Sequence, residues 1–150
     1  QSLTVFLILK YENFKNIKIK LKNNQSIHFE LGRSIVGQCG FLISKILYTK
    51  KSYNKNFIVL DSGMNNLIRP ALYNSKHKIS NISSRSNKIE AYDIVGPICE
   101  STDTFAKDYE MVESKRGDLV VIYSCGAYAE SMSSNYNLRD NIKSYYSDTI

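Results

Sequence analysis

Phe41-Leu42-Ile43-Ser44-Lys45-Ile46-Leu47-Tyr48 is the longest of several short runs, rich in β-branched and aromatic residues, that follow Arg33. Clusters of Gly, Asn, Ser and Lys separate these runs, and short runs bounded by turn-forming residues are typical of strands. The pattern predicts a mostly β domain with one helical insert. The other runs lie at residues 35–36, 57–60, 94–95 and 119–123.

The segment from Arg69 to Tyr73 is the predicted helical insert. Asn65 or Asn66 can cap it, and Pro70 then lies in the first turn, where a missing N–H costs little. Arg69 and Tyr73 are four residues apart, so we expect them to share one helix face.

The beginning of the chain carries two competing periods over residues 3–22. Phe14, Ile17 and Leu21 fall at helical spacing, but between residues 17 and 21 the apolar residues also alternate with lysines as in a strand. The residues alone leave both readings open. An Asn-Asn-Gln break at residues 23–25 separates this segment from the next.

Composition and charge limit the class of protein. A chain of 150 residues with 43% hydrophobic content predicts one soluble domain, or one domain with a piece of another. The net charge of +6 is spread over lysines among Asn, Ser and Tyr without a nucleic-acid motif, which indicates a solvated basic surface. The apolar run at residues 3–9 is far shorter than the ~20 residues of a spanning helix and lacks signal-peptide flanks, so we expect a cytoplasmic protein without a membrane partner.

Cysteine and histidine placement predicts no metal site. Cys39, Cys99 and Cys125 have no Cys-x-x-Cys spacing, and three cysteines do not form an even disulfide framework. His28 and His77 have no partners at metal-ligand or catalytic spacing. A reducing compartment fits these cysteines best.

Four short strings place charged, thiol or phenol groups beside turn-forming Gly or Pro. Arg69 offers a planar guanidinium fork and Tyr73 a phenol on the same face, which suits a carboxylate in a partly desolvated pocket. At Cys99 an apolar strand changes abruptly to a polar turn, which would expose the thiol. The strings are Glu30-Leu31-Gly32-Arg33, Arg69-Pro70-Ala71-Leu72-Tyr73, Gly96-Pro97-Ile98-Cys99-Glu100-Ser101 and Gly126-Ala127-Tyr128.

Together these strings resemble, in the same order, the diaminopimelate decarboxylase family, whose members use pyridoxal 5'-phosphate (PLP) in lysine biosynthesis. The resemblance runs from about Phe14 to Asn137 and includes residues 61–70 and 131–137. It implies a mainly β chain with some α: the C-terminal β-barrel domain of a fold type III PLP decarboxylase plus the last helix and strand of a β/α barrel. Residues 1–33 would be the C-terminal end of the PLP-binding barrel, with a helix before a last strand at 26–30, and residues 34–150 the β-barrel decarboxylase domain.

The resemblance also implies residue roles. Cys99 would return a proton to carbon after CO2 leaves, a step for which a thiol is a plausible acid, and would reach with Glu100 across a homodimer interface into the neighbour's site. Glu100 would bind the distal ammonium of meso-diaminopimelate, where decarboxylases of ornithine or arginine carry Asp. Leu31 and Asp140 stand where the family usually has Pro. The implied cofactor-binding residues are Glu30, which would face the ring nitrogen, Gly32, Arg33 and Tyr128; the implied substrate-binding residues are Arg33, Arg69, Tyr73, Glu100 and Tyr128.

The implied reaction is PLP-dependent decarboxylation of meso-2,6-diaminopimelate to L-lysine. The Schiff-base lysine and the Gly-rich phosphate loop, which the family carries in its N-terminal barrel, have no counterpart in this sequence. We therefore expect the isolated 150 residues neither to bind the cofactor specifically nor to release CO2. Two alternatives remain open: a non-catalytic remnant or regulatory subunit of the same fold, and a basic β domain that binds nucleic acid.

Overall fold

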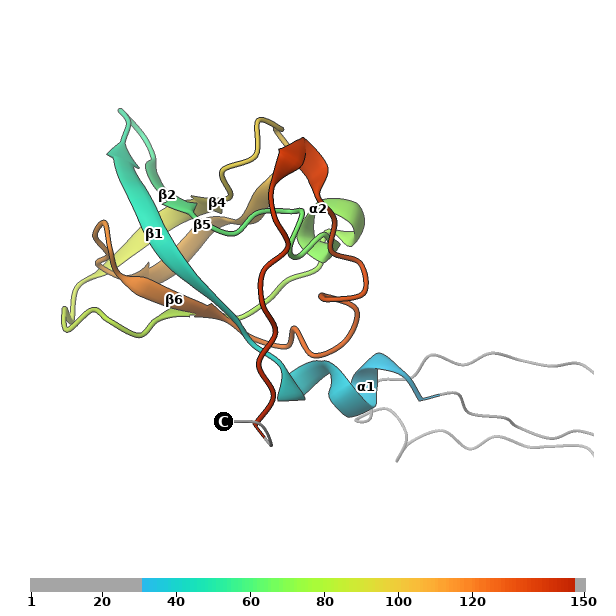
Figure 1. Ribbon diagram of the computed structural model, residues 1–150. Coiled ribbons are helices and arrows are strands. Elements are labelled where there is room, and N and C mark those ends of the chain that lie inside the picture. The colour runs from blue at the N-terminus through green and yellow to red at the C-terminus, as the bar shows by residue number, and fades with distance from the viewer. Residues whose placement is uncertain (1–30, 148–150) are drawn as a thin grey trace, which may run out of the picture.

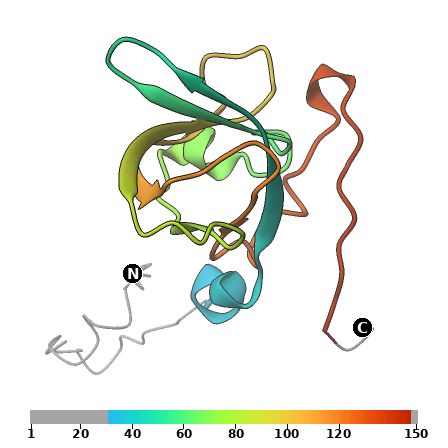
Figure 2. The same cartoon turned by 90° about the vertical axis from the view of Figure 1, so that its left-hand side faces the viewer.

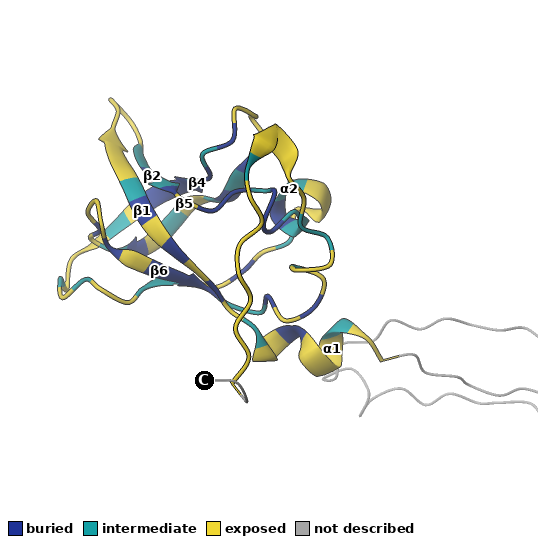
Figure 3. Cartoon of the chain, in the orientation of Figure 1, coloured by how far each residue is buried: buried dark blue, intermediate teal, exposed yellow. Residues whose placement is uncertain are grey.

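Buried and exposed residues alternate over the first five residues of the first strand, β1 (Leu42–Lys51), so one face of this part of the strand lies against the core. Leu42, Ser44 and Ile46 are buried, whereas Ile43 and Lys45 between them are exposed. Successive side chains of a strand point to opposite faces, so a single strand separates the core from solvent. Figure 3 shows the same alternation of colour along β1.

Six strands form one sheet that curls into a nearly closed barrel (Figures 1 and 2) in the computed structural model, which describes residues 31–147. The strand order is β3-β6-β1-β2-β4-β5, and every pair is antiparallel except β2 with β4. The mainly β architecture predicted from the sequence is confirmed. The remaining strands are β2 (Asn56–Leu60), β3 (Ile79–Asn81), β4 (Ile89–Val95), β5 (Thr104–Val112) and β6 (Leu119–Ile122).

A single side chain joins the two edge strands of the sheet. The Tyr109 hydroxyl on β5 donates to the carbonyl of Ile79 on β3 at 3.1 Å and accepts from the amide of Ile79 at 2.8 Å. Both backbone groups of Ile79 are thereby satisfied without a β3–β5 ladder. The barrel encloses an apolar core of Leu42, Ile46, Ile58, Leu60, Leu67, Ile79, Tyr92, Ile94, Phe105, Met111, Val120, Ile122 and Cys125.

The helical elements are short. They are α1 (Arg33–Val36), the 3-10 turn η2 (Gly37–Cys39), α2 (Arg69–Tyr73) and the 3-10 turn η3 (Tyr136–Leu138). The predicted helix from Arg69 to Tyr73 is confirmed, with Pro70 in its first turn. None of the helices within residues 31–147 is long and apolar enough to cross a membrane.

Two local predictions differ from the structure. Residues 35–36 were predicted as a strand but lie in α1, because contacts of Arg33 with distant backbone override the β propensity of Ile35 and Val36. The predicted Asn caps of α2 are wrong: Ile68 is the N-cap, without a side-chain bond, and Asn66 Oδ1 accepts from the Gly63 amide at 3.1 Å instead.

The strands β3 and β5 were not predicted. β5 carries three charged residues in its centre and a bulge where its pairing with β4 shifts, at Asp108 with a φ of 49°. The extra residue interrupts the alternation on which strand prediction depends. The predicted helix or strand at residues 3–22 and the predicted last barrel strand at 26–30 lie outside the described residues.

Candidate active site

The backbone of the α1 region packs directly against the turn that follows β6. The amide of Cys125 donates to the Gly40 carbonyl at 2.8 Å, and that of Gly126 donates to the Gly37 carbonyl at 3.0 Å. A Cβ on Gly126 would overlap the carbonyl oxygen of Val36 and lie 2.8 Å from the Gly40 amide nitrogen. The two segments can approach this closely because neither position 126 nor position 40 has a side chain.

Arg33 fixes the same turn from the side. Its Nη1 donates to the Ala127 carbonyl at 3.0 Å and its Nη2 donates to the Ser124 carbonyl at 2.8 Å. Burial lowers the pKa of Arg33, and the nearby charge of Arg69 lowers it further. The guanidinium remains charged in proteins. Arg33 therefore brings positive charge to the turn that carries Tyr128.

The hydroxyl of Tyr128, which belongs to this turn, lies next to Gly32. Tyr128 has a φ of 67°, and its side chain is about half exposed. A Cβ on Gly32 would lie 3.1 Å from the Tyr128 hydroxyl oxygen, so the two residues are in contact range. The structure thus brings Gly32, Arg33 and Tyr128 together, as their predicted joint role requires. Glu30, the fourth predicted cofactor residue, lies outside the described residues.

Arg69 and Tyr73 share one face of α2, as predicted. The guanidinium carbon of Arg69 lies 5.0 Å from the centroid of the Tyr73 ring, a cation–π distance. Nε of Arg69 is buried and has no hydrogen-bond partner among the described residues. Within residues 31–147 neither Arg33 nor Arg69 forms an ion pair with a carboxylate. Two neighbouring guanidiniums without acidic partners are suited to an anionic ligand.

His77 lies buried beside the two arginines. Its Nδ1 is 2.8 Å from the carbonyl oxygen of Tyr123, and because a carbonyl can only accept, Nδ1 carries the proton. Burial lowers the pKa of His77 below its usual value of 6.5, and the charges of Arg33 and Arg69 lower it further, while the carbonyl bond offsets part of the shift. The neutral imidazole is therefore the form that the fold favours.

We predict that the His77→Gln variant loses less stability on acidification than the wild type. Above pH 6.5 the imidazole is neutral in both folded and unfolded states, so its contribution is fully present. As the pH falls below 6.5, the unfolded chain takes up a proton that the folded chain resists, and the free energy of unfolding decreases, by at most about 1.4 kcal/mol per pH unit for one proton. Urea unfolding from pH 7 to about 5, above most carboxyl pKa values, measures the two slopes. Equal slopes would show that His77 titrates alike in both states.

Cys99 and Glu100 occupy the exposed tip of the loop at residues 96–103, between β4 and β5. The thiol is free and exposed, as predicted for a turn. The Glu100 amide donates to the Ile98 carbonyl at 2.8 Å, and the Ser101 amide donates to the Glu100 carboxylate at 2.9 Å. These bonds shape the tip of the loop and leave both reactive side chains at the surface.

The two groups of predicted site residues lie at opposite ends of the domain. In Figures 1 and 2 the loop between β4 and β5 is at the top of the barrel and α1 is at the bottom. Within one chain, Cys99 and Glu100 therefore do not meet Arg33 and Tyr128.

Asp103, at the end of this loop, was not singled out from the sequence. Its side chain is buried, and its carboxylate accepts from two backbone amides. An Asp just beyond a turn is a common backbone hydrogen-bond acceptor, and this was the available signal.

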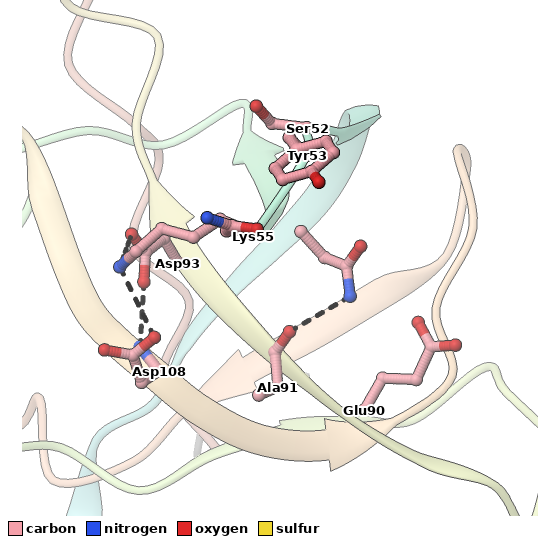
Figure 4. Close-up of a pocket in the computed structure, with 9 residues that line it drawn as sticks. Ser52, Tyr53, Lys55, Glu90, Ala91, Asp93 and Asp108 are labelled. Atoms are coloured by element: carbon pink, nitrogen blue, oxygen red, sulfur yellow. Dashed lines mark hydrogen bonds and ion pairs between the residues drawn. The ribbon is translucent and has the colours of Figure 1, made fainter.

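A shallow groove of about 410 Å³ lies away from these residues, beside the turn from β1 to β2 (Figure 4). Lys55 Nζ is 2.9 Å from Asp93 Oδ2 and 3.3 Å from Asp108 Oδ1, so the charges of the groove are largely paired with each other. Among residues 31–147 no cluster of three or more His, Cys, Asp or Glu side chains could hold a metal ion.

Comparison with known proteins relates the chain to one family. The family described as pyridoxal-dependent decarboxylase, C-terminal sheet domain, matches residues 9–126. Diaminopimelate decarboxylase of Bacteroides thetaiotaomicron is 54% identical over 133 residues, which make up 89% of this chain and 34% of that protein. The protein of the same name from Helicobacter pylori is 44% identical in an alignment 145 residues long, which covers 89% of this chain and 36% of that protein.

A solved structure gives the same relation. The crystal structure of diaminopimelate decarboxylase from Helicobacter pylori complexed with L-lysine superposes with a TM-score of 0.68 and 48% identity, over 77% of this chain and 28% of that chain. The chain spans about a third of the length of the curated relatives that it matches.

Proposed function

The chain belongs to the pyridoxal-dependent decarboxylase family, as its C-terminal sheet domain, and from this we propose that it is the C-terminal part of a diaminopimelate decarboxylase. The proposed reaction is the PLP-dependent conversion of meso-2,6-diaminopimelate to L-lysine and CO2. The observation that carries the proposal is an exposed thiol and carboxylate, Cys99 and Glu100, in a chain that is 54% identical to a protein of that name. The guanidiniums of Arg33 and Arg69, which form no ion pair with a carboxylate within residues 31–147, add a matching site for anionic groups.

The described residues fit a cofactor with a phosphate and a substrate with carboxylates. Nε of Arg69 is a buried donor without a partner within the described part of the chain, and the Tyr128 hydroxyl is a half-exposed donor beside Gly32. Phosphate and carboxylate oxygens are the acceptors that such donors prefer. When bound, PLP supplies the electron sink for loss of CO2.

Each site residue has its own role in the proposed reaction. Arg69 binds a substrate carboxylate, with Tyr73 beside it on the same face of α2. Tyr128 would donate a hydrogen bond from its hydroxyl to the cofactor phosphate, and Arg33 holds the turn in which Tyr128 lies. Cys99 Sγ returns a proton to the carbon that has lost CO2, which is general acid catalysis. Glu30, which lies outside the described residues, would pair with the ring nitrogen of the cofactor, a role that the family resemblance implies.

The arrangement of these residues supports a homodimer. Cys99 and Glu100 lie at the opposite end of the domain from Arg33 and Tyr128, so a site that uses all four residues would take them from two chains. In a two-fold dimer each chain gives the same surface to its partner, and two complete sites result.

The proposal is tested by assaying the complete protein, this chain together with its N-terminal barrel, for release of CO2. With PLP present we expect turnover of meso-diaminopimelate and little turnover of ornithine or arginine. Cofactor binding without CO2 release from any of them would favour a non-catalytic subunit. Salt-sensitive binding to random DNA, with no cofactor binding, would favour a nucleic-acid-binding domain.

We predict that Glu100→Asp weakens selection of diaminopimelate over ornithine by ~1–3 kcal/mol, or about 5–150-fold in the ratio of kcat/KM values. The shorter side chain withdraws the carboxylate from the distal ammonium by one methylene. Glu110→Asp makes the same change at an exposed position on β5 and serves as the matched control. If Glu100→Asp kept the full preference, the distal head of the substrate would have to be recognised by another residue.

A further inference from the structure

Asp103 joins two loops that are far apart in the sequence. Asp103 is only 3% exposed. Each of its two carboxylate oxygens accepts a hydrogen bond from one backbone amide. The amide of Ile98 donates to Oδ2 at 2.7 Å, and the amide of Met64 donates to Oδ1 at 2.7 Å. Amide bonds to a carboxylate at this length are charge-assisted and stronger than neutral ones.

One of the two donors lies directly beside the proposed site residues, and the other lies in the segment that precedes α2. Ile98 immediately precedes Cys99 and Glu100, and Met64 lies in the segment between β2 and α2 that leads into Arg69. The backbone amide of Gly96 also donates to the Asp103 carbonyl at 3.0 Å, which closes the base of the loop. One carboxylate therefore ties the Cys99 loop to the segment between β2 and α2.

The surrounding residues leave room for a carboxylate at this point and for little else. A Cβ on Gly96 would overlap the Asp103 carboxylate, and a Cβ on Gly63 would lie 2.8 Å from a side-chain carbon of Ile98 and 3.1 Å from Asp103 Oδ2. No lysine or arginine forms an ion pair with Asp103 within residues 31–147. The two amides are thus the groups that hold this buried carboxylate, and burying it is costly unless they do.

We propose that Asp103 is a positioning residue for the decarboxylation: by binding the amides of Ile98 and Met64 at once, it sets the place of Cys99 and Glu100 at the tip of the loop, from which they would enter the partner's site. This inference rests on the proposed function of Cys99 and Glu100. Asparagine cannot replace Asp103, because it has one acceptor oxygen and its NH2 group would face the second amide donor. A small displacement of a catalytic group is enough to slow a reaction strongly.

The first test is a double-mutant cycle in the complete, cofactor-loaded enzyme. Asp103→Asn should lower kcat for meso-diaminopimelate by ~10–100-fold in the wild-type background and by less than about 3-fold in a Cys99→Ala background, because it acts through Cys99. Asp108→Asn removes an exposed carboxylate on β5 and is the matched control, with turnover unchanged. An unchanged kcat for Asp103→Asn, or an equal loss in both backgrounds, would overturn the proposal.

The second test reads the loop without any turnover. Alkylation of Cys99 by iodoacetamide, followed at that residue by mass spectrometry, should be several-fold faster in Asp103→Asn than in the wild type and unchanged in Asp108→Asn. An equal Cys99 rate in all three proteins would overturn the positioning role, whether or not the wild type releases CO2; failure of the wild type to release CO2 would count against the proposed function alone. Should Asp103→Asn not fold, Asp103→Glu, which keeps the charge but lengthens the side chain, takes its place in both tests.

Discussion

Replacing Cys99 with alanine in the complete enzyme should slow release of CO2 from meso-diaminopimelate by ~10²–10⁴-fold, the usual loss on removing a general acid. The methyl group of alanine carries no proton to return to carbon. The exposed tip of the β4–β5 loop tolerates the change, so folding and cofactor binding should persist. Steady-state kinetics together with the absorbance of the bound cofactor measure both quantities.

A second exposed thiol provides the control for this variant. Cys39 is also free and exposed, and its Sγ donates to the Val36 carbonyl at 2.9 Å, a bond that Cys39→Ser can keep. Turnover in Cys39→Ser should stay close to the wild-type value. If Cys99→Ala turned over as fast as the wild type, another group would have to supply the proton.

Replacing Gly126 with alanine should destabilise the domain by ~3 kcal/mol or more, at the upper end of the cost of overpacking. The new Cβ would overlap the Val36 carbonyl and crowd the Gly40 amide, and both are backbone atoms that cannot rotate away. The α1 region would have to separate from the turn that carries Tyr128. Urea unfolding measures the loss of stability, and limited proteolysis within α1 measures the separation.

Gly117→Ala distinguishes this steric effect from backbone strain. Gly117 has a φ of 92°, but a Cβ there would meet nothing within 4 Å, so only the left-handed conformation is penalised. We expect a cost of ~1 kcal/mol for that strain. A Gly126→Ala protein as stable as Gly117→Ala would show that the two segments can move apart at little cost.

Local patterns predicted much of the fold. The run of β-branched and aromatic residues at 41–48 and the proline in the first turn of α2 are local features of the sequence, and the strand and the helix predicted from them are confirmed. The α1 segment could not be read in this way, because Arg33 bonds to carbonyls more than 90 positions away, at Ser124 and Ala127. Tertiary contacts of this kind override local propensity.

Some residues of the candidate site could also be predicted from local sequence, and others depend on distant contacts. The strings that contain Arg69, Cys99 and Tyr128 could be recognised because reactive groups stand beside turn-forming residues. The role of Asp103 depends on the amide of Met64, 39 positions away, and on the space left at Gly96. Neither the distant amide nor that space leaves a signal in the sequence.

The closure of the barrel through Tyr109 affects where the domain opens locally. Between β3 and β5 one phenol replaces a ladder of backbone bonds, so this seam can open without disturbing any strand pair of the sheet. Amide hydrogens that need only such a local opening exchange with solvent at a free energy well below that of global unfolding. The Ile79 amide, which is bonded to that phenol, would therefore exchange sooner than the amides of β1, which has a neighbouring strand on each side.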